Sequence, residues 1–519
     1  MFDKQLQPLV QELQRGDLSS LKSGFLHGLE RESMRINRKG ALADTPHPLH
    51  LGSAFTNPKI LTDFSESQLE YVTAPHHNIG DALHELDALQ RFTVHNLDQE
   101  LLWPFSMPPR LPEEEAKIPL AYYGTSAAAK IKTLYRKGLG YRYGRRMQTI
   151  SGVHYNISFP KELLQAISQQ RYGQSLNKQT QADIYLGTIR NFTRYAPVIL
   201  YLFGASPAID NSFANIPEPL EALGSDSHYV PAATTLRLSE IGYTSSIQDH
   251  LTISLNSLEE YIKGLCYAVN TTYPPFERFN ANGENQLNDH YLQIENEYYA
   301  LIRPKQTPRK GETVLDGLKS RGIEYLEIRC IDIDPFVANG VSSDSLHFTQ
   351  LLLFYLALQE SPAISPDEKL QLQENQKQTV WYGRSPELSI FHNGKLEKLS
   401  DMGLQLCDEL QDYAKILDNY AGGSHYQEVL GRQKEKFVSS QKTPAAKFNR
   451  LILNNGSFLQ TGLEVARNNW SHFHGQKQDS KTREQFEKLA SQSLFEQRKI
   501  ELENKAMSLE PPKVCNGNR

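Results

Sequence analysis

The spacing of hydrophobic residues along the chain alternates between helical and strand periodicity. Residues 2–13 and 79–97 repeat apolar positions every three or four residues, which predicts amphipathic helices. Residues 180–205 are largely apolar, and we expect them to form a buried helix that stops at Gly204. These segments supply helical surfaces that can pack on a sheet.

Runs of strand character lie between and beyond these helices. Residues 28–36, 154–159 and 322–329 are rich in alternating, β-branched or aromatic side chains, which predicts strands. Residues 104–112 contain four prolines and therefore predict a loop. Strands and helices do not alternate regularly, so a doubly wound parallel sheet is not expected.

These patterns predict an α+β fold in which an antiparallel sheet is surrounded by helices. The sheet elements are expected within residues 24–336, and the chain becomes mainly helical over residues 345–519. The tail from residue 480 is rich in Glu, Lys and Gln, so we expect an exposed helix that frays at Pro511. A length of 519 residues is enough for about three domains, yet we expect residues 1–519 to form a single domain.

Composition narrows the class of protein. The net charge is −5, from 55 basic and 60 acidic residues, which argues against a nucleic-acid-binding protein. The 4 cysteines are far apart and the N-terminus lacks an apolar signal segment, so we expect a reduced, cytoplasmic protein. The most apolar runs, residues 197–203 and 351–358, are too short to cross a membrane, and no membrane association is predicted.

An unusual pair of acidic residues lies in the first predicted strand. Glu30 and Glu32 share one face of the strand with Met34, because successive side chains point to opposite faces. Two like charges on a partly buried face are unfavourable unless a positive charge lies between them. Carboxylate oxygens are the ligands that Mg²⁺ prefers, so the pair predicts a divalent cation.

Three further strand-like runs carry polar residues of the same kind. Glu70 lies in one, His154 and Asn156 share a face of another, and Glu327 and Arg329 share a face of the third. Each has an ordinary alternative: a solvated carboxylate, a hydrogen-bonded core histidine, or a structural ion pair. Together they predict one sheet face that carries oxygen ligands and a cation, which suits a metal and phosphate.

The chain lacks the common nucleotide and hydrolase motifs. There is no Walker-type G-x-x-x-x-G-K-[ST] loop, no G-x-S-x-G elbow and no H-E-x-x-H. If a nucleotide binds, metals and separate basic residues must hold its phosphates. The candidates are Arg329, Arg303, Lys305 and Arg237, each of which taken alone is more often a surface charge.

Several longer strings resemble those of the proteobacterial glutamate–cysteine ligase family. In chain order they are Gly28-Leu29-Glu30-Arg31-Glu32, Thr62-Asp63-Phe64, Lys132-Thr133-Leu134-Tyr135-Arg136, Met147-Gln148-Thr149-Ile150-Ser151-Gly152-Val153-His154-Tyr155-Asn156, Tyr201-Leu202-Phe203-Gly204-Ala205-Ser206-Pro207-Ala208, Gln293-Ile294-Glu295-Asn296-Glu297, Ile302-Arg303-Pro304-Lys305 and Gly322-Ile323-Glu324-Tyr325. The resemblance implies a single catalytic domain similar to the catalytic part of glutamine synthetase, with a curved antiparallel sheet that forms a funnel.

The same resemblance implies an activity and its ligands. The family joins the γ-carboxylate of L-glutamate to the amine of L-cysteine through γ-glutamyl phosphate, as the first step of glutathione biosynthesis. ATP is the co-substrate and Mg²⁺ the expected metal, with Mn²⁺ as the alternative. Glutathione is expected as a feedback inhibitor, and we expect a monomer.

By resemblance, individual residues take roles. The expected metal ligands are Glu30, Glu32, Glu70, Glu327 and His154, with Asp63 as a further ligand or a group that supports one. Glu327 and Arg329 are expected to be catalytic, and Arg329 is expected to face the transferred phosphoryl group. Arg303 and Lys305 are candidates for nucleotide binding. The expected substrate-binding residues are Phe64, Tyr135, Leu139, Gln148, Arg237, Tyr243 and Tyr299, although these aromatic residues could equally be ordinary core.

Three other functions remain open at this level. An ATP-dependent ligase that joins glutamate to another amine would use the same acidic residues. A metal-dependent hydrolase could use the carboxylates on a bound water, without Arg329. A metabolite sensor without catalysis would not need the full acidic set.

Overall fold

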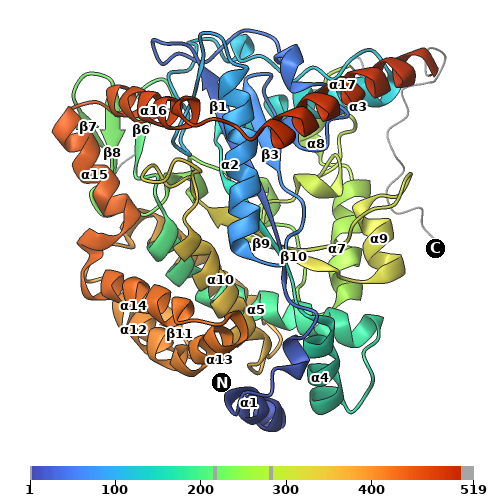
Figure 1. The fold of residues 1–519 in the computed structure, drawn as a ribbon, viewed down its shortest axis with the longest axis vertical. Helices are drawn as coiled ribbons and strands as arrows, with labels where there is room; N and C mark the ends of the chain where they lie inside the picture. Colours follow the sequence, from blue (N-terminus) through green and yellow to red (C-terminus); the bar gives the residue numbers. More distant parts are fainter. Residues whose placement is uncertain (1–2, 214–218, 280–283, 504–519) are drawn as a thin grey trace.

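The computed structural model describes residues 3–213, 219–279 and 284–503 (Figure 1). Its strands are β1 (Leu26–Ile36), β2 (Ile60–Thr62), β3 (Gln68–Val72), β4 (Leu101–Leu102), β5 (Val153–Ser158), β6 (Ala208–Asp210), β7 (Glu221–Leu223), β8 (Ser227–Tyr229), β9 (Ile302–Lys305), β10 (Tyr325–Ile331), β11 (Ser389–His392) and β12 (Lys395–Lys398). Its α-helices are α1 (Gln7–Gln14), α2 (Ile79–His95), α3 (Ala127–Tyr143), α4 (Lys161–Tyr172), α5 (Lys178–Phe203), α6 (Ser246–Asp249), α7 (Leu258–Asn270), α8 (Pro274–Glu277), α9 (Val314–Arg321), α10 (Ser343–Ala357), α11 (Pro366–Tyr382), α12 (Leu399–Glu409), α13 (Gln411–Ala421), α14 (His425–Val438), α15 (Pro444–Asn455), α16 (Phe458–Gly475) and α17 (Ser480–Glu503).

The central feature is an antiparallel sheet with the strand order β2-β3-β1-β5-β10-β9. β4 extends it by pairing with the end of β1. Strand β1 lies in the middle because its long alternating run pairs with β3 on one side and β5 on the other. The predicted α+β fold with an antiparallel sheet is therefore confirmed.

Helices cover one face of this sheet. α2 packs on β1 and β3, α5 packs on β9 and β10, and α10 packs against both helices. Figure 1 shows α2 running across the sheet in front of β1 and β3. Arg31 of β1 reaches Gln90 of α2, so the odd-numbered side chains of β1 point to the helices. The side chains of Glu30 and Glu32 therefore point away from the helices, from the opposite face of the sheet.

The predicted helix over residues 180–205 corresponds to α5. Asn177 caps its first turn by accepting from the backbone N–H of Thr180, and the helix ends where Gly204 follows Phe203. Nearly all of its C-terminal half is buried, which agrees with the apolar sequence. The apolar run in residues 351–358 is likewise buried, within and directly after α10.

Three elements differ from the sequence expectation. α3 was not expected, because its apolar positions are interrupted by Lys, Arg and Gly. A hairpin, β11–β12, interrupts the helical second half; its turn is Asn393-Gly394, both with positive φ, which is a turn signal readable in the sequence. The tail helix α17 is mostly exposed, as expected, but it is also docked on one side, where Phe486, Ala490 and Ser493 are buried. Pro511 lies outside the described residues.

Candidate active site

The sheet register brings the acidic residues together. Glu30 of β1 lies opposite His154 of β5, and Glu32 lies opposite Glu70 of β3. On the far side of β5, Glu327 of β10 lies opposite Asn156. Residues from four strands therefore meet on one face because each sits at a matching register position.

Short distances connect this cluster. His154 Nδ1 lies 3.1 Å from Glu30 Oε2 and 4.0 Å from Glu327 Oε1, while His154 Nε2 lies 3.7 Å from Glu32 Oε1. Asn156 Nδ2 donates to Glu30 Oε1 at 2.9 Å, and the backbone N–H of Gly152 donates to Glu32 Oε2 at 2.8 Å. These bonds orient the two carboxylates of β1.

Basic residues gather on the β10 side of the cluster. Arg329 Nη1 lies 3.1 Å and Lys305 Nζ 3.5 Å from Glu327 Oε1. Arg303 of β9 lies directly opposite Glu327 of β10, and its side chain is buried. The two residues predicted for nucleotide binding thus lie beside the two predicted as catalytic.

The geometry fits a metal ion. Glu30, His154 and Glu327 each offer one ligand atom, and these atoms lie within 4.8 Å of one another. Among the described residues, Glu327 Oε2 is buried without a hydrogen-bond partner. Two carboxylates and an imidazole are donors for a divalent cation, and the free Glu327 oxygen has an acceptor position to offer it.

The carboxylates Glu30 and Glu327 form one half of the cluster, and Glu32 and Glu70 form the other half. The two halves differ in charge balance. Burial alone would raise the pKa of Glu327, but Lys305 and Arg329 hold it well below the usual range. Burial likewise opposes ionisation of Glu30, and the hydrogen bond with His154 keeps its pKa below the ordinary value. This half holds charged carboxylates at neutral pH.

In the other half, which holds Glu32 and Glu70, burial and neighbouring carboxylates outweigh the basic residues nearby. Burial and the neighbouring Asp63 raise the pKa of Glu32 to about 8. Burial, Asp63 and Glu30 raise the pKa of Glu70 well above its ordinary value. Such crowding of carboxyl groups is relieved by a cation bound among them.

Helix α3 contributes two basic residues to which sequence reasoning assigned no role. Arg136 Nη2 lies 3.8 Å from Asp63 Oδ1, and Lys132 Nζ lies 4.2 Å from the centre of the Tyr123 ring. Burial and the nearby Arg136 lower the pKa of Lys132 to about 8. Lys132, Tyr135 and Arg136 are spaced to share one face of a helix. This spacing is the sequence signal that could have identified the two basic residues.

Most residues predicted to bind the amino-acid substrates lie close to one another. The rings of Tyr243 and Tyr299 are 4.6 Å apart, and Gln148 Nε2 donates to Tyr299 Oη at 3.1 Å. Phe64 packs close to Gly140, next to Leu139 of α3. Burial raises the pKa of Tyr135 well above its ordinary value, and the nearby Tyr243 adds to this rise.

Arg237 lies between this group and the acidic cluster. Its Nη2 donates to the backbone oxygen of Arg329 at 2.7 Å, and its Nη1 lies 3.6 Å from Asp332 Oδ1. A Cβ at Gly152 would overlap the Arg237 guanidinium, so glycine is needed where the arginine approaches the start of β5. Tyr143 and Gln248, which sequence reasoning missed, contact the group around Tyr299: the Tyr299 N–H donates to Gln248 Oε1 at 2.8 Å, and the ring centres of Tyr143 and Tyr299 are 5.7 Å apart.

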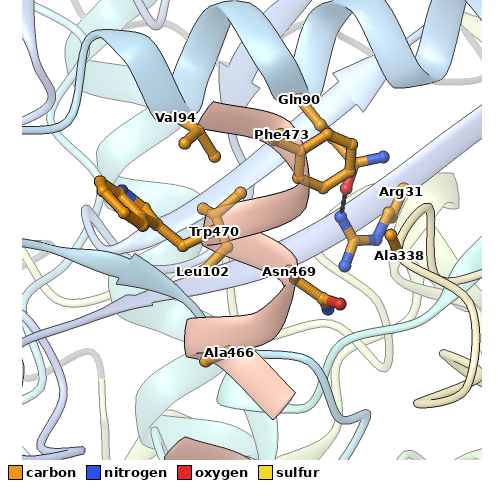
Figure 2. A pocket seen from close by; sticks show the side chains of 9 residues that line it. All are labelled: Arg31, Gln90, Val94, Leu102, Ala338, Ala466, Asn469, Trp470 and Phe473. Atoms are coloured by element: carbon orange, nitrogen blue, oxygen red, sulfur yellow. Dashed lines mark hydrogen bonds between the residues drawn. The ribbon is translucent and has the colours of Figure 1, made fainter. Parts of the chain in front are cut away.

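A separate cavity of about 10 Å³ lies on the helical side of β1 (Figure 2). Arg31, Gln90, Trp470 and Phe473 are among its lining residues, and Arg31 donates to Gln90 there. Arg31 alternates with Glu30 along the strand and points away from the cluster. The cavity has room for about one water molecule, so it is no substrate site.

Comparison with known proteins identifies the family of the chain. A family model described as glutamate-cysteine ligase matches residues 10–379, more than half of the chain. The chain belongs to the glutamate–cysteine ligase family. Among family members, the glutamate–cysteine ligase of Leptospira interrogans is 47% identical over 501 residues, covering 94% of this chain and 95% of the relative. That of Pseudomonas aeruginosa is 39% identical over 481 residues, covering 92% and 91%.

Solved structures show the same fold. The glutamate–cysteine ligase of Francisella tularensis in complex with AMP superposes with a TM-score of 0.87 at 33% identity, covering 94% of this chain and 96% of that one. A bifunctional glutathione synthetase from Pasteurella multocida gives a TM-score of 0.70 at 25% identity, covering 90% of this chain and 54% of that one. The resemblance read from the sequence is therefore confirmed, while the roles of individual residues stay predictions. None of the described helices is long and apolar enough to span a membrane.

Proposed function

We propose that this glutamate–cysteine ligase family member forms γ-glutamylcysteine from L-glutamate and L-cysteine with ATP. The observation that carries the proposal is the cluster of Glu30, His154 and Glu327 beside the Arg329 guanidinium. A ligase needs both a metal-binding set and a cation that faces the transferred phosphoryl group. The same cluster lies in a chain that matches the family over most of its length.

The acidic cluster is proposed to hold Mg²⁺, with Mn²⁺ as the alternative. Glu30, His154 and Glu327 would form one set of ligands; Glu32 and Glu70, with Asp63 beside them, would form the rest. A bound divalent cation neutralises charge on the nucleotide phosphates. The raised pKa values of Glu32 and Glu70 support the second part of this assignment, because burial and neighbouring carboxylates outweigh the basic residues nearby.

In the first step, the glutamate γ-carboxylate attacks the γ-phosphorus of ATP, which yields γ-glutamyl phosphate and ADP. Arg329 would stabilise charge on the transferred oxygens, since Glu327 holds one edge of its guanidinium and a guanidinium has five N–H donors in all. Arg303 and Lys305 on β9 are placed to contact the nucleotide phosphates beside it.

In the second step, the cysteine amine attacks the acyl carbon, and phosphate leaves from the tetrahedral intermediate. The group around Tyr243, Tyr299 and Gln148, with Phe64, Tyr135 and Leu139, would hold the small, partly apolar cysteine. Arg237, which lies beside this group, would bind an α-carboxylate, since a guanidinium pairs with carboxylates in bidentate geometry. No covalent enzyme intermediate is needed, in agreement with the absence of a nucleophile motif.

The decisive experiment measures ADP release by the purified protein with ATP and Mg²⁺. Glutamate alone, cysteine alone and both together are compared, and the dipeptide is identified by mass. ADP matched by γ-glutamylcysteine only with both amino acids supports the proposal. Turnover with glutamate and another amine would change the acceptor, and no ATP use at all would overturn the proposal and favour a hydrolase or sensor.

Other properties belong to the same proposal. We propose that residues 1–519 act as one catalytic domain in a cytoplasmic monomer, and that glutathione competes with glutamate as a feedback inhibitor. Size-exclusion chromatography with light scattering tests the monomer. Inhibition assays at varied glutamate concentration test the competition.

A further inference from the structure

The helix α17 packs against two segments that precede α3, the helix that carries Tyr135 and Leu139. It lies outside residues 10–379, which the family model matches. Phe486 at its start contacts Phe92 of α2, with ring centres 5.5 Å apart. Further along, one face of the helix meets two loops, around residues 52–56 and 124–125. These contacts indicate that α17 supports the two loops.

The first loop is bonded to α17 through Ser493 and Gln497. The Ser53 N–H donates to Ser493 Oγ at 2.9 Å, and Thr56 Oγ1 donates to the Ser493 backbone oxygen at 2.6 Å. Ser53 Oγ donates to Gln497 Oε1. Gly52 has a φ of 91°, and a Cβ there would lie 2.8 Å from the Ala490 Cα, so glycine allows the close approach.

The second loop is bonded to α17 through Glu501. The Thr125 N–H donates to Glu501 Oε1 at 2.8 Å. Thr125 directly precedes Ser126, the N-cap of α3. The carboxylate therefore sits at the N-terminal end of α3, where the helix dipole favours negative charge. The hydrogen bond from the Thr125 N–H lowers the pKa of Glu501 and outweighs the opposing effect of burial, which keeps the carboxylate charged.

Both loops lead to side chains at the site. Phe55 belongs to the first and Tyr123 precedes the second, and Lys132 Nζ lies 5.9 Å and 4.2 Å from their ring centres. Tyr123 Oη donates to the backbone oxygen of Asp63 at 2.8 Å. Arg136, one turn after Lys132, is the residue that pairs with Asp63.

We propose that Ser493, Gln497 and Glu501 form a clamp that positions α3, and through it Tyr135 and Arg136, against the acidic cluster. We name these three residues the α17 clamp. They are positioning residues, because they contact the loop at 52–56 and the residues directly before α3 rather than a substrate. The clamp residues bond to the two loops, whereas Glu327 and Arg329 lie on β10. Loss of the clamp is therefore expected to weaken the amino-acid site more than the nucleotide site.

The test compares Glu501→Ala with Glu496→Ala, an exposed glutamate on the same helix. Since the role rests on the proposed function, KM and kcat are measured for ATP and cysteine, together with amide hydrogen exchange over residues 124–132. Glu501→Ala is expected to raise KM for cysteine roughly fivefold to tenfold, as loss of one charge-assisted hydrogen bond would. KM for ATP should stay within about twofold and exchange at 124–132 should accelerate. Glu501→Gln, which keeps an acceptor oxygen, should restore most of the cysteine KM.

Equal kinetics and equal exchange in Glu501→Ala and Glu496→Ala would overturn the clamp, as would parallel rises in KM for ATP and cysteine. If Glu501→Ala does not fold, Gln497→Ala, which removes the acceptor for Ser53 Oγ, provides the same comparison. A wild-type chain that makes no γ-glutamylcysteine would overturn the proposed function instead. The exchange measurement then decides the clamp independently of activity.

Discussion

Arg329 Nη1 donates to Glu327 Oε1 at 3.1 Å, and the two residues leave the same face of β10. Arg329 Nη1 also lies 3.4 Å from His154 Nδ1 of the neighbouring strand. The guanidinium is thus fixed between a carboxylate and an imidazole that are both candidates for metal binding. Changes at either member of the Glu327–Arg329 pair should therefore affect turnover without disturbing the sheet.

Replacing Glu327 by Gln should leave the protein folded and reduce kcat for ADP formation about 100-fold or more. The change removes a charge at nearly constant shape, and losing one preorganised electrostatic contact typically costs this much. Thermal unfolding followed by circular dichroism verifies the fold. Glu324→Gln, an exposed neighbour on the same segment, is the control. Wild-type turnover in a folded Glu327→Gln protein would remove its proposed role.

Replacing Arg329 by Met should lower kcat on the order of 10³-fold, because an arginine aimed at the transferred phosphoryl group can contribute that much. Arg329→Lys should recover part of the rate, since it keeps the charge but loses the planar fork. Steady-state ADP release measures both variants. Arg309→Met, at an exposed position, should behave as wild type. Equal rates in Arg329→Met and Arg309→Met would contradict the assignment.

Stability should fall below pH 6.5 because of His27. Burial, aided by the charge of His347, lowers its pKa from 6.5 to about 3, and its Nδ1 lies 2.7 Å from Tyr155 Oη. Between these two pH values the unfolded chain binds a proton that the folded chain does not, so acidification favours unfolding. The expected loss is about 1.4 kcal/mol per pH unit.

Urea unfolding at pH 7.5, 6.5 and 5.5 measures this slope. His27→Gln should flatten the pH dependence by that amount, whereas His50→Gln, at an exposed position, should not. If wild type and His27→Gln show the same slope, His27 does not have the depressed pKa.

Gly462→Ala in α16 should destabilise the protein by about 1–3 kcal/mol, the usual cost of overpacking a core. A Cβ at this position would lie 2.7 Å or less from atoms of the Trp103 ring, which is fully buried. Gly431→Ala in α14 is the matched control, because nothing lies within 4 Å of its Cβ position. There, helix propensity should raise the free energy of unfolding by up to about 1 kcal/mol. Chemical denaturation of both variants provides the comparison.

Much of the local structure was readable from the sequence. Alternation along β1 placed Glu30 and Glu32 on one face, and the same rule paired Glu327 with Arg329, because side-chain direction in a strand is a local property. The end of α5 at Gly204 was also predicted. The β11–β12 hairpin was missed although Asn393-Gly394 is a hairpin signal, since the helical pattern around it dominated the interpretation.

The site itself depended on contacts far apart in the chain. Glu30 and His154 are opposed because β1 pairs with β5, and 124 residues separate them. No local pattern specifies which strands pair, or in which register, because those choices follow from burying the helical faces of α2, α5 and α10. The docking of α17 is of the same kind: its polar composition predicted exposure, whereas Ser493 and Glu501 bond to loops near the opposite end of the chain.

By itself, the sequence determined the α+β class, the direction of the acidic side chains along each strand and the family to which the chain belongs. These follow from residue type and spacing, which act over a few positions. Tertiary structure alone decided which carboxylates lie together, that Arg329 and Lys305 both pair with Glu327, and that α17 bonds to residues 53 and 125. Those relationships arise from strand register and packing, where the free energy comes from contacts between segments that the linear order does not bring together.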